Sequence, residues 1–162
     1  MNVENQAGSN QYLTFNLDGE MFALPVTQVR EILEFTPMTR IPQTPDYMRG
    51  VINVRDKVVP VIDMRTKFGL AQIAETVDTC IIIVQVQIEG ESTMVGALVD
   101  SVQEVLELSA DQIEAPPRMG TRLNTDFLHG MAKIEDDFAM ILDIDKVFSS
   151  DGLAILQQKA NT

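Results

Sequence analysis

Most hydrophobic positions along the chain follow a two-residue period or form short, continuous β-branched runs. Residues 12–17 alternate apolar and polar side chains, and residues 80–88 begin as a continuous apolar run and end as an alternating one. Both patterns are typical of β-strands, and turn signals such as Asp18-Gly19 and Glu89-Gly90 follow them. The predicted strands are residues 12–17, 21–26, 51–54, 58–62, 80–88, 93–99, 131–134 and 138–144.

Helical patterns are short by comparison. Apolar spacing predicts helices over residues 26–33 and 64–68, and a C-terminal helix over residues 150–159 that Ser150 can cap. Many short strands with turns at regular intervals favour a barrel or a sandwich. The sequence therefore predicts a mainly β fold with few short helices.

The chain also repeats itself. VREILEF (29–35) aligns with VQEVLEL (102–108), and GVINVRDKVVPVIDMRTKF (50–68) aligns with GMAKIEDDFAMILDIDKVF (130–148). The two blocks occur in the same order, which indicates a duplication that produced two similar β subdomains. Shared positions indicate scaffold, so Asp63 and Asp143, each before a short helix, are interpreted as N-caps.

Composition narrows the class of partner. Twelve Lys and Arg against 24 Asp and Glu give a net charge of −12, and the basic residues are scattered singly. This pattern argues against nucleic acid and against insertion into or binding to a membrane. Because the N-terminus is polar, we expect no secretory signal; no apolar run is long enough to span a bilayer, and one cysteine fits a reducing cytoplasm.

The chain offers few signs of catalysis. No phosphate-binding loop and no nucleophile elbow are present, and His129 is the only histidine. Cys80 is interpreted as a buried small hydrophobe. The stretch 143–148 begins like a calcium loop but has Val147 and Phe148 where an oxygen ligand and glycine belong. We therefore expect no catalytic residue, no metal and no cofactor; an enzyme using Asp63, Asp100 or Asp143 with Glu31 stays open as an alternative.

One position in the repeat changes the sign of its charge. Arg55 aligns with Glu135, between two apolar runs that form a hairpin. Because function is expected where the copies differ, Arg55 is a candidate functional residue; a solvated turn charge is the alternative.

Four stretches carry a resemblance to a known family. They are YLTFNLDGEMFALPVTQVREIL, TRIPQTPDYMRGVINVRDKVVPVIDMRTKFGL, VGALVDSVQEVLELSADQI and FLHGMAKIEDDFAMILDIDKVF. Together they resemble the CheW family, the coupling proteins of bacterial chemotaxis, over about residues 11–156. The resemblance implies a single CheW-like domain over 12–156, with two SH3-like five-stranded barrels. The approximate subdomains are 12–70 and 77–148, with an interwoven boundary, a flexible tail over 1–11 and a second tail over 157–162.

The resemblance also implies a function. Family members are non-catalytic adaptors in the cytoplasm that hold the tip of a chemoreceptor against the histidine kinase CheA at membrane-associated arrays. Val29, Glu31 and Ile32 match the family's groove-lining segment, and Arg55 matches the arginine used at the receptor contact. Val105 and Gly130 fall in segments expected to contact the regulatory domain of the kinase; core packing and a tight turn are their alternative roles.

Asp56 departs from the family pattern, which has glycine directly after the arginine. Aspartate tolerates a positive φ, so the turn should persist, with Asp56 placed to pair with Arg55. A second function also stays open: a regulatory β module that holds a small ligand in the groove between the barrels.

Overall fold

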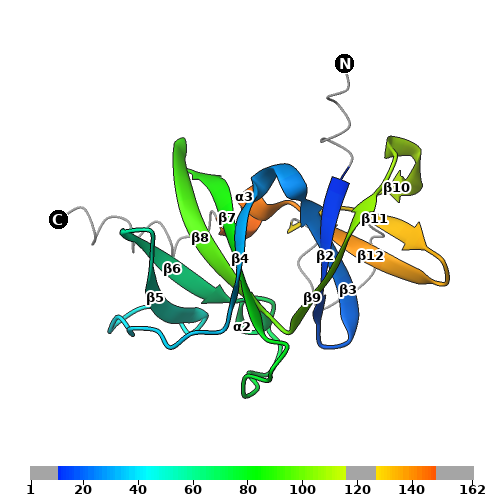
Figure 1. Ribbon diagram of the computed structural model, residues 1–162. Helices are drawn as coiled ribbons and strands as arrows, with labels where there is room; N and C mark the ends of the chain where they lie inside the picture. Colours follow the sequence, from blue (N-terminus) through cyan, green and yellow to red (C-terminus); the bar gives the residue numbers. More distant parts are fainter. Residues whose placement is uncertain (1–10, 116–126, 149–162) are drawn as a thin grey trace.

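The computed structural model describes residues 11–115 and 127–148, and their backbone forms two β-sheets that lie side by side (Figure 1). The first sheet has the strand order β4-β7-β8-β6-β5, and the second has the order β10-β11-β12-β3-β2-β9. The strands are β2 (Gln11–Leu17), β3 (Glu20–Pro25), β4 (Val29–Glu34), β5 (Met48–Val54), β6 (Lys57–Asp63), β7 (Cys80–Ile88), β8 (Glu91–Val99), β9 (Ser101–Glu107), β10 (Ile113–Glu114), β11 (Leu128–Ile134) and β12 (Asp137–Leu142).

The mainly β prediction is confirmed, and each strand predicted from the sequence overlaps an observed one. The first sheet has the five strands that were expected. The second has six, because the two-residue strand β10 pairs with β11 at its outer edge. The short helical elements are η1 (Val26–Gln28), α2 (Met64–Lys67), η2 (Ala110–Gln112) and α3 (Ile144–Phe148).

The two sheets exchange strands along the chain. The hairpin β2–β3 belongs to the second sheet, although β4, β5 and β6, which follow it, belong to the first. The chain returns to the second sheet at Asp100, between β8 and β9. Each of the ranges 12–70 and 77–148 therefore supplies strands to both sheets.

The sequence repeat is also a repeat of topology. In each sheet, one antiparallel hairpin joins a second hairpin through a short parallel pairing, Val61 with Gly96 in the first sheet and Ile141 with Ala23 in the second. A strand with a β-bulge, β4 or β9, then lies at the far edge. The two aligned blocks thus fold into equivalent elements, β5-β6-α2 and β11-β12-α3.

A shared hydrophobic core joins the sheets. Ile82 and Val84 from the first sheet and Phe15 and Phe22 from the second belong to one buried cluster. Phe22 also stacks on Phe68 at a centroid distance of 5.8 Å. Each sheet also has one smaller buried hydrophobic cluster of its own. Burial of apolar surface from both sheets favours their association, because the hydrophobic stabilisation is roughly proportional to the apolar area removed from water.

The prediction of a helix over residues 26–33 is wrong. Its first three residues form the 3-10 turn η1, and the rest form strand β4. A bulge between Val29 and Glu31 shifts the register of β4 against β7. The turn and the bulge place apolar residues three or four apart on one side, which imitates the period of a helix.

The helix predicted over residues 64–68 is confirmed, and so are both predicted N-caps. Asp63 Oδ1 accepts hydrogen bonds from the backbone N–H of Arg65 at 3.0 Å and of Thr66 at 3.4 Å. Asp143 Oδ1 accepts one from the backbone N–H of Lys146 at 3.3 Å. The predicted C-terminal helix over 150–159 and the two predicted tails, apart from Gln11, lie outside the described residues. Among the described residues, no helix is long and apolar enough to cross a membrane.

Candidate protein-binding surface

Strand β4 presents two apolar residues on the side of the shared core. Directly opposed residues of an antiparallel pair point to the same face. Val29 opposes Val84, and Ile32 opposes Ile82; both partners belong to the shared core. Because β4 is an edge strand, this face is only partly covered, and Ile32 stays 44% exposed. The structure therefore places Val29 and Ile32 together on one partly open apolar strip.

Glu31 points to the other face of β4 and meets Arg55. Glu31 Oε1 lies 3.5 Å from Arg55 Nε, and the Arg55 side chain is 83% exposed. Strands β4 and β5 are the two edges of the first sheet, so this ion pair connects one edge strand with the turn that follows the other. The expectation that Arg55 pairs with Asp56 is wrong, because the turn directs the guanidinium toward Glu31 instead.

The β5–β6 turn has the backbone geometry that the family's glycine would permit. Arg55 has φ of 52° and Asp56 has φ of 68°, so both residues adopt the left-handed region. The backbone N–H of Asp56 donates to Asn53 Oδ1 at 3.0 Å, which stabilises the turn from the side chain of Asn53. The predicted positive φ at Asp56 is confirmed.

Val105 occupies the same place in the second sheet as Ile32 in the first. It lies on the bulged edge strand β9, opposes Leu13 of the shared core, and is 51% exposed. Core packing is therefore not its role. The aligned segments 29–35 and 102–108 thus each present an exposed aliphatic residue at the edge of one sheet.

Gly130 is buried in β11 and does not form a tight turn. A Cβ atom at this position would lie 2.6 Å from Ile113 Cγ2 and 2.7 Å from Glu114 O. The glycine therefore allows β10 to approach β11 closely. Gly50, its partner in the repeat, has the same role, because its Cβ would lie 2.6 Å from the carbonyl oxygen of Thr39, whose backbone bonds to Val51.

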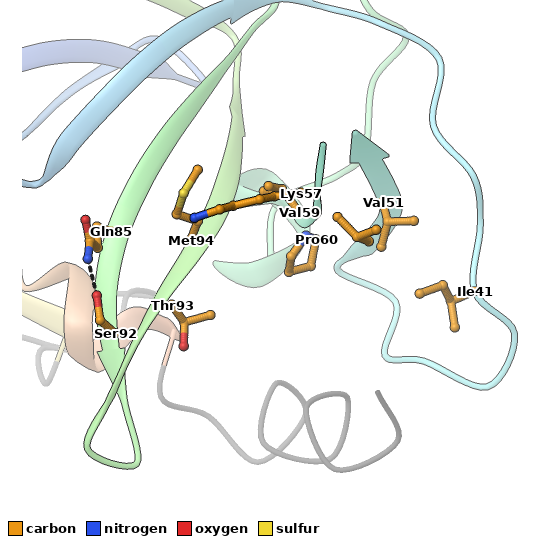
Figure 2. A pocket seen from close by; sticks show the side chains of 10 residues that line it. Ile41, Val51, Lys57, Val59, Pro60, Gln85, Ser92, Thr93 and Met94 are labelled. Carbon is orange, nitrogen blue, oxygen red and sulfur yellow. Dashed lines mark hydrogen bonds between the residues drawn. The ribbon is translucent and has the colours of Figure 1, made fainter. Parts of the chain in front are cut away.

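A cavity of about 470 Å³ opens where β6 and β8 diverge within the first sheet (Figure 2). Its walls are mostly apolar, and its amide and hydroxyl groups already have partners: Gln85 Nε2 donates to Ser92 Oγ, and Gln85 Oε1 accepts from Arg30. The cavity is not a groove between the sheets, and these polar groups do not converge on a ligand. It gives little support to the small-ligand alternative.

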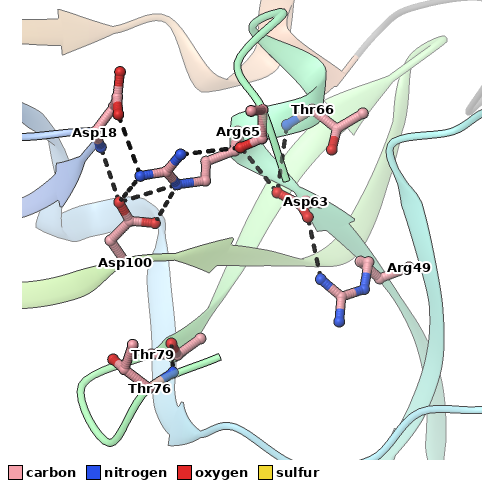
Figure 3. A network of polar contacts seen from close by, with 9 residues as sticks. Asp18, Arg49, Asp63, Arg65, Thr66, Thr76, Thr79 and Asp100 are labelled. Carbon is pink, nitrogen blue, oxygen red and sulfur yellow. Dashed lines mark hydrogen bonds and ion pairs between the residues drawn. The ribbon is translucent and has the colours of Figure 1, made fainter. Parts of the chain in front are cut away.

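The carboxylates considered for catalysis take part in structural contacts (Figure 3). Asp63, besides capping α2, accepts a hydrogen bond from Arg49 Nη1 at 3.1 Å. Asp100 accepts three from Arg65: Nε donates to Oδ1 at 2.9 Å and to Oδ2 at 3.1 Å, and Nη2 donates to Oδ2 at 2.9 Å. These bonds raise the pKa of Arg65 above its ordinary value. Within the described residues no cluster of three or more His, Cys, Asp or Glu side chains could hold a metal.

Sequence reasoning missed Arg65 and its contacts. The signal was present, because Arg65 aligns with Asp145 and so changes sign between the copies, as Arg55 does. Cys80 was expected to be buried and is only partly so; it packs beside the shared core and donates to the carbonyl of Asp78. Burial is the main cause of a raised pKa for its thiol, which disfavours a thiolate nucleophile.

Comparison with known proteins assigns the chain to a family. A family model described as the CheW-like domain matches residues 11–152. The chemotaxis protein CheW of Klebsiella aerogenes is 32% identical over 94% of this chain and 89% of its own, and that of Rhizobium meliloti is 33% identical over 89% and 90%. The crystal structure of the scaffolding protein TtCheW from Thermoanaerobacter tengcongensis superposes with a TM-score of 0.78 and 34% identity, over 89% of this chain and 90% of that one.

These matches span nearly the whole chain, in agreement with the topology and with the motifs around Arg55. The chain therefore belongs to the CheW family of chemotaxis scaffold proteins.

Proposed function

We propose that this chain is a non-catalytic adaptor that holds the cytoplasmic tip of a chemoreceptor against the histidine kinase CheA. Family membership supports the adaptor role, and the observation that carries the receptor contact is the 83% exposed Arg55 on the first sheet. The proposal places the protein in the cytoplasm, recruited to membrane-associated receptor arrays, and it involves no cofactor and no nucleic acid.

The proposed receptor surface consists of Val29, Glu31, Ile32 and Arg55. A helical receptor tip offers anchors on one face, and Val29 and Ile32 supply a partly open apolar strip for them. Arg55 has a planar fork of donors that suits a carboxylate or an amide of the partner. Its exposed ion pair with Glu31 is weak, about 1 kcal/mol or less, so a receptor group can compete for the guanidinium.

The proposed kinase surface lies on the second sheet, around Val105. An aliphatic side chain that is half exposed on an edge strand suits an apolar contact between two related β folds. Gly130 is included in this proposal because the absence of a Cβ atom lets β10, the other edge strand of the second sheet, approach β11 closely. The two partners would then bind to different sheets.

The test is a pair of binding titrations with purified protein, one against a soluble receptor cytoplasmic fragment and one against CheA. Arg55→Ala should weaken receptor binding about tenfold and leave kinase binding unchanged, because the arginine lies on the first sheet. Arg30→Ala is the matched control, since Arg30 is an exposed arginine on strand β4 of the same sheet and bonds to Gln85 instead.

Kinase binding is tested with Val105→Asp. This substitution should weaken binding to CheA and leave binding to the receptor fragment unchanged. Val77→Asp is its control, because Val77 is fully exposed and lies outside the strands. If the wild-type protein binds neither partner, the adaptor proposal is wrong and the ligand-binding module becomes the better account.

A further inference from the structure

Arg65 connects the two sheets through a set of directional polar contacts. It lies on α2, directly after strand β6 of the first sheet. Its guanidinium donates to Asp100, where the chain crosses from the first sheet to the second, and to Asp18 in the β2–β3 turn of the second sheet at 3.3 Å. Figure 3 shows both aspartates converging on this side chain, which is only 12% exposed.

Further bonds hold the same group of residues in place. The backbone N–H of Asp18 donates to Asp100 Oδ2 at 2.8 Å, and Arg65 Nη1 donates to the carbonyl of Ala71 at 2.9 Å. The backbone N–H of Asp100 donates to the carbonyl of Asn16 on β2 at 3.1 Å. The Arg65 contact therefore joins α2, the crossover and a hairpin of the opposite sheet.

Asp145 makes the equivalent connection from the other half of the repeat. It is the second residue of α3, as Arg65 is of α2, and α3 follows strand β12 of the second sheet. Its Oδ1 accepts from Gln28 Nε2 at 3.1 Å, and Gln28 ends the 3-10 turn where the chain crosses from the second sheet to the first. The same oxygen accepts from the backbone N–H of Gln87 on β7 of the first sheet at 3.1 Å.

The two contacts are thus related by the internal repeat and differ in chemistry. In each, the second residue of a short helix reaches the crossover and a hairpin of the opposite sheet. One contact is a charged network with two carboxylates, and the other is a single carboxylate that accepts from an amide and a backbone N–H. Between them they hold both points at which the described chain passes from one sheet to the other.

We propose that Arg65 and Asp145 are positioning residues that fix the angle between the two sheets. The shared core alone does not define this angle sharply, because hydrophobic contact is non-directional. Charge-assisted hydrogen bonds have preferred directions, and a two-pronged arginine–carboxylate contact defines orientation as well as distance. The consequence for binding rests on the proposed function: a fixed angle holds the receptor surface of the first sheet in a constant relation to the Val105 surface of the second.

The test measures the distance distribution between the sheets by pulsed electron spin resonance, without any partner. Spin labels replace the exposed Lys57 on β6 and Lys133 on β11 in a Cys80→Ser background. Arg65→Met and Asp145→Ala should each shift the distribution or broaden it about twofold, because each removes one set of charge-assisted bonds. Asp145→Asn should keep the wild-type distribution, because its amide oxygen accepts the same two bonds.

Arg49→Met is the matched control. The Arg49–Asp63 ion pair is also partly buried, but it joins β5 and β6 within the first sheet. The Arg49→Met substitution should lower the free energy of unfolding without changing the distance between the labels. Circular dichroism checks that each variant is folded, and Arg65→Lys, which keeps the charge but loses the fork, replaces Arg65→Met if that variant is unfolded.

The proposal is overturned if Arg65 and Asp145 variants that remain folded keep the wild-type distribution, or if Arg49→Met changes it equally. Titration with the receptor fragment is a separate readout. A changed distribution with unaltered receptor affinity would uphold the positioning role and would contradict only its proposed consequence for binding.

Discussion

At the scale of single residues, the proposed receptor contact depends on the β5–β6 turn. Arg55 and Asp56 both adopt positive φ values, and the turn projects Arg55 across the first sheet to Glu31 on the opposite edge strand. The sign change at position 55 in the repeat made Arg55 a candidate from the sequence. Its partner could not be predicted, because Glu31 lies on β4, at the other edge of the first sheet, and becomes its neighbour only in the folded sheet.

The geometry of this turn predicts the effect of restoring glycine. Asp56→Gly should raise the free energy of unfolding by about 0.5–1 kcal/mol, because glycine adopts the left-handed region without a Cβ penalty. The backbone bond from residue 56 to Asn53 is kept. Urea denaturation measures the change, and Lys57→Gly, at the first position of β6, is the control that should be destabilising. A loss of stability in Asp56→Gly would show that the aspartate side chain is needed in the turn.

At the scale of elements, the two-residue period of the apolar positions identified most of the strands, and the helix N-caps followed from aspartates at the ends of strands. Strand β9 was missed; like β4, it carries a bulge that interrupts the period. The failure at residues 26–33 has a physical cause. Spacing of apolar residues reports which side chains share a face, and a 3-10 turn followed by a bulged strand gives nearly the spacing of a helix. The two-residue strand β10 was missed because so short a segment has no detectable period.

Gly130 gives a direct test of the packing between elements. Gly130→Ala should lower the free energy of unfolding by about 1–3 kcal/mol, because the new Cβ would overlap Ile113 Cγ2 and the carbonyl oxygen of Glu114. Gly90→Ala is the control: its Cβ would meet no atom within 4 Å, so only its φ of 81° opposes the change, at a cost of about 1–2 kcal/mol.

The double variant Gly130→Ala/Ile113→Ala separates the two overlaps at this site. It removes the clash with the isoleucine side chain and keeps the clash with the backbone oxygen. Chemical denaturation of the single and double variants measures the coupling between the two positions. A Gly130→Ala protein as stable as the wild type would contradict the close approach of β10 to β11.

At the scale of the whole molecule, the internal repeat predicted two similar halves but not how they exchange strands. Sequence similarity between two segments shows that they fold alike, and it carries no information about which hairpin completes which sheet. The exchange follows from the pairing of β3 with β12 and of β8 with β6, contacts between segments far apart in the chain. It also explains why polar contacts gather at the two crossovers, around Asp100 and Gln28.

The same architecture separates the two proposed binding surfaces, Arg55 with its neighbours on the first sheet and Val105 on the second. An adaptor must bind both partners at once, and surfaces on different sheets meet this requirement. The most direct measurement is capture of CheA by an immobilised receptor fragment, with and without this protein. We expect capture only when the wild-type protein is present.

The two surface variants make that measurement decisive. With Arg55→Ala, less of both the adaptor and the kinase should be captured by the receptor fragment, whereas with Val105→Asp the adaptor should remain bound with less of the kinase. Capture of the kinase by both variants at the wild-type level, or no capture with the wild-type protein, would contradict the account of an adaptor with one partner on each sheet.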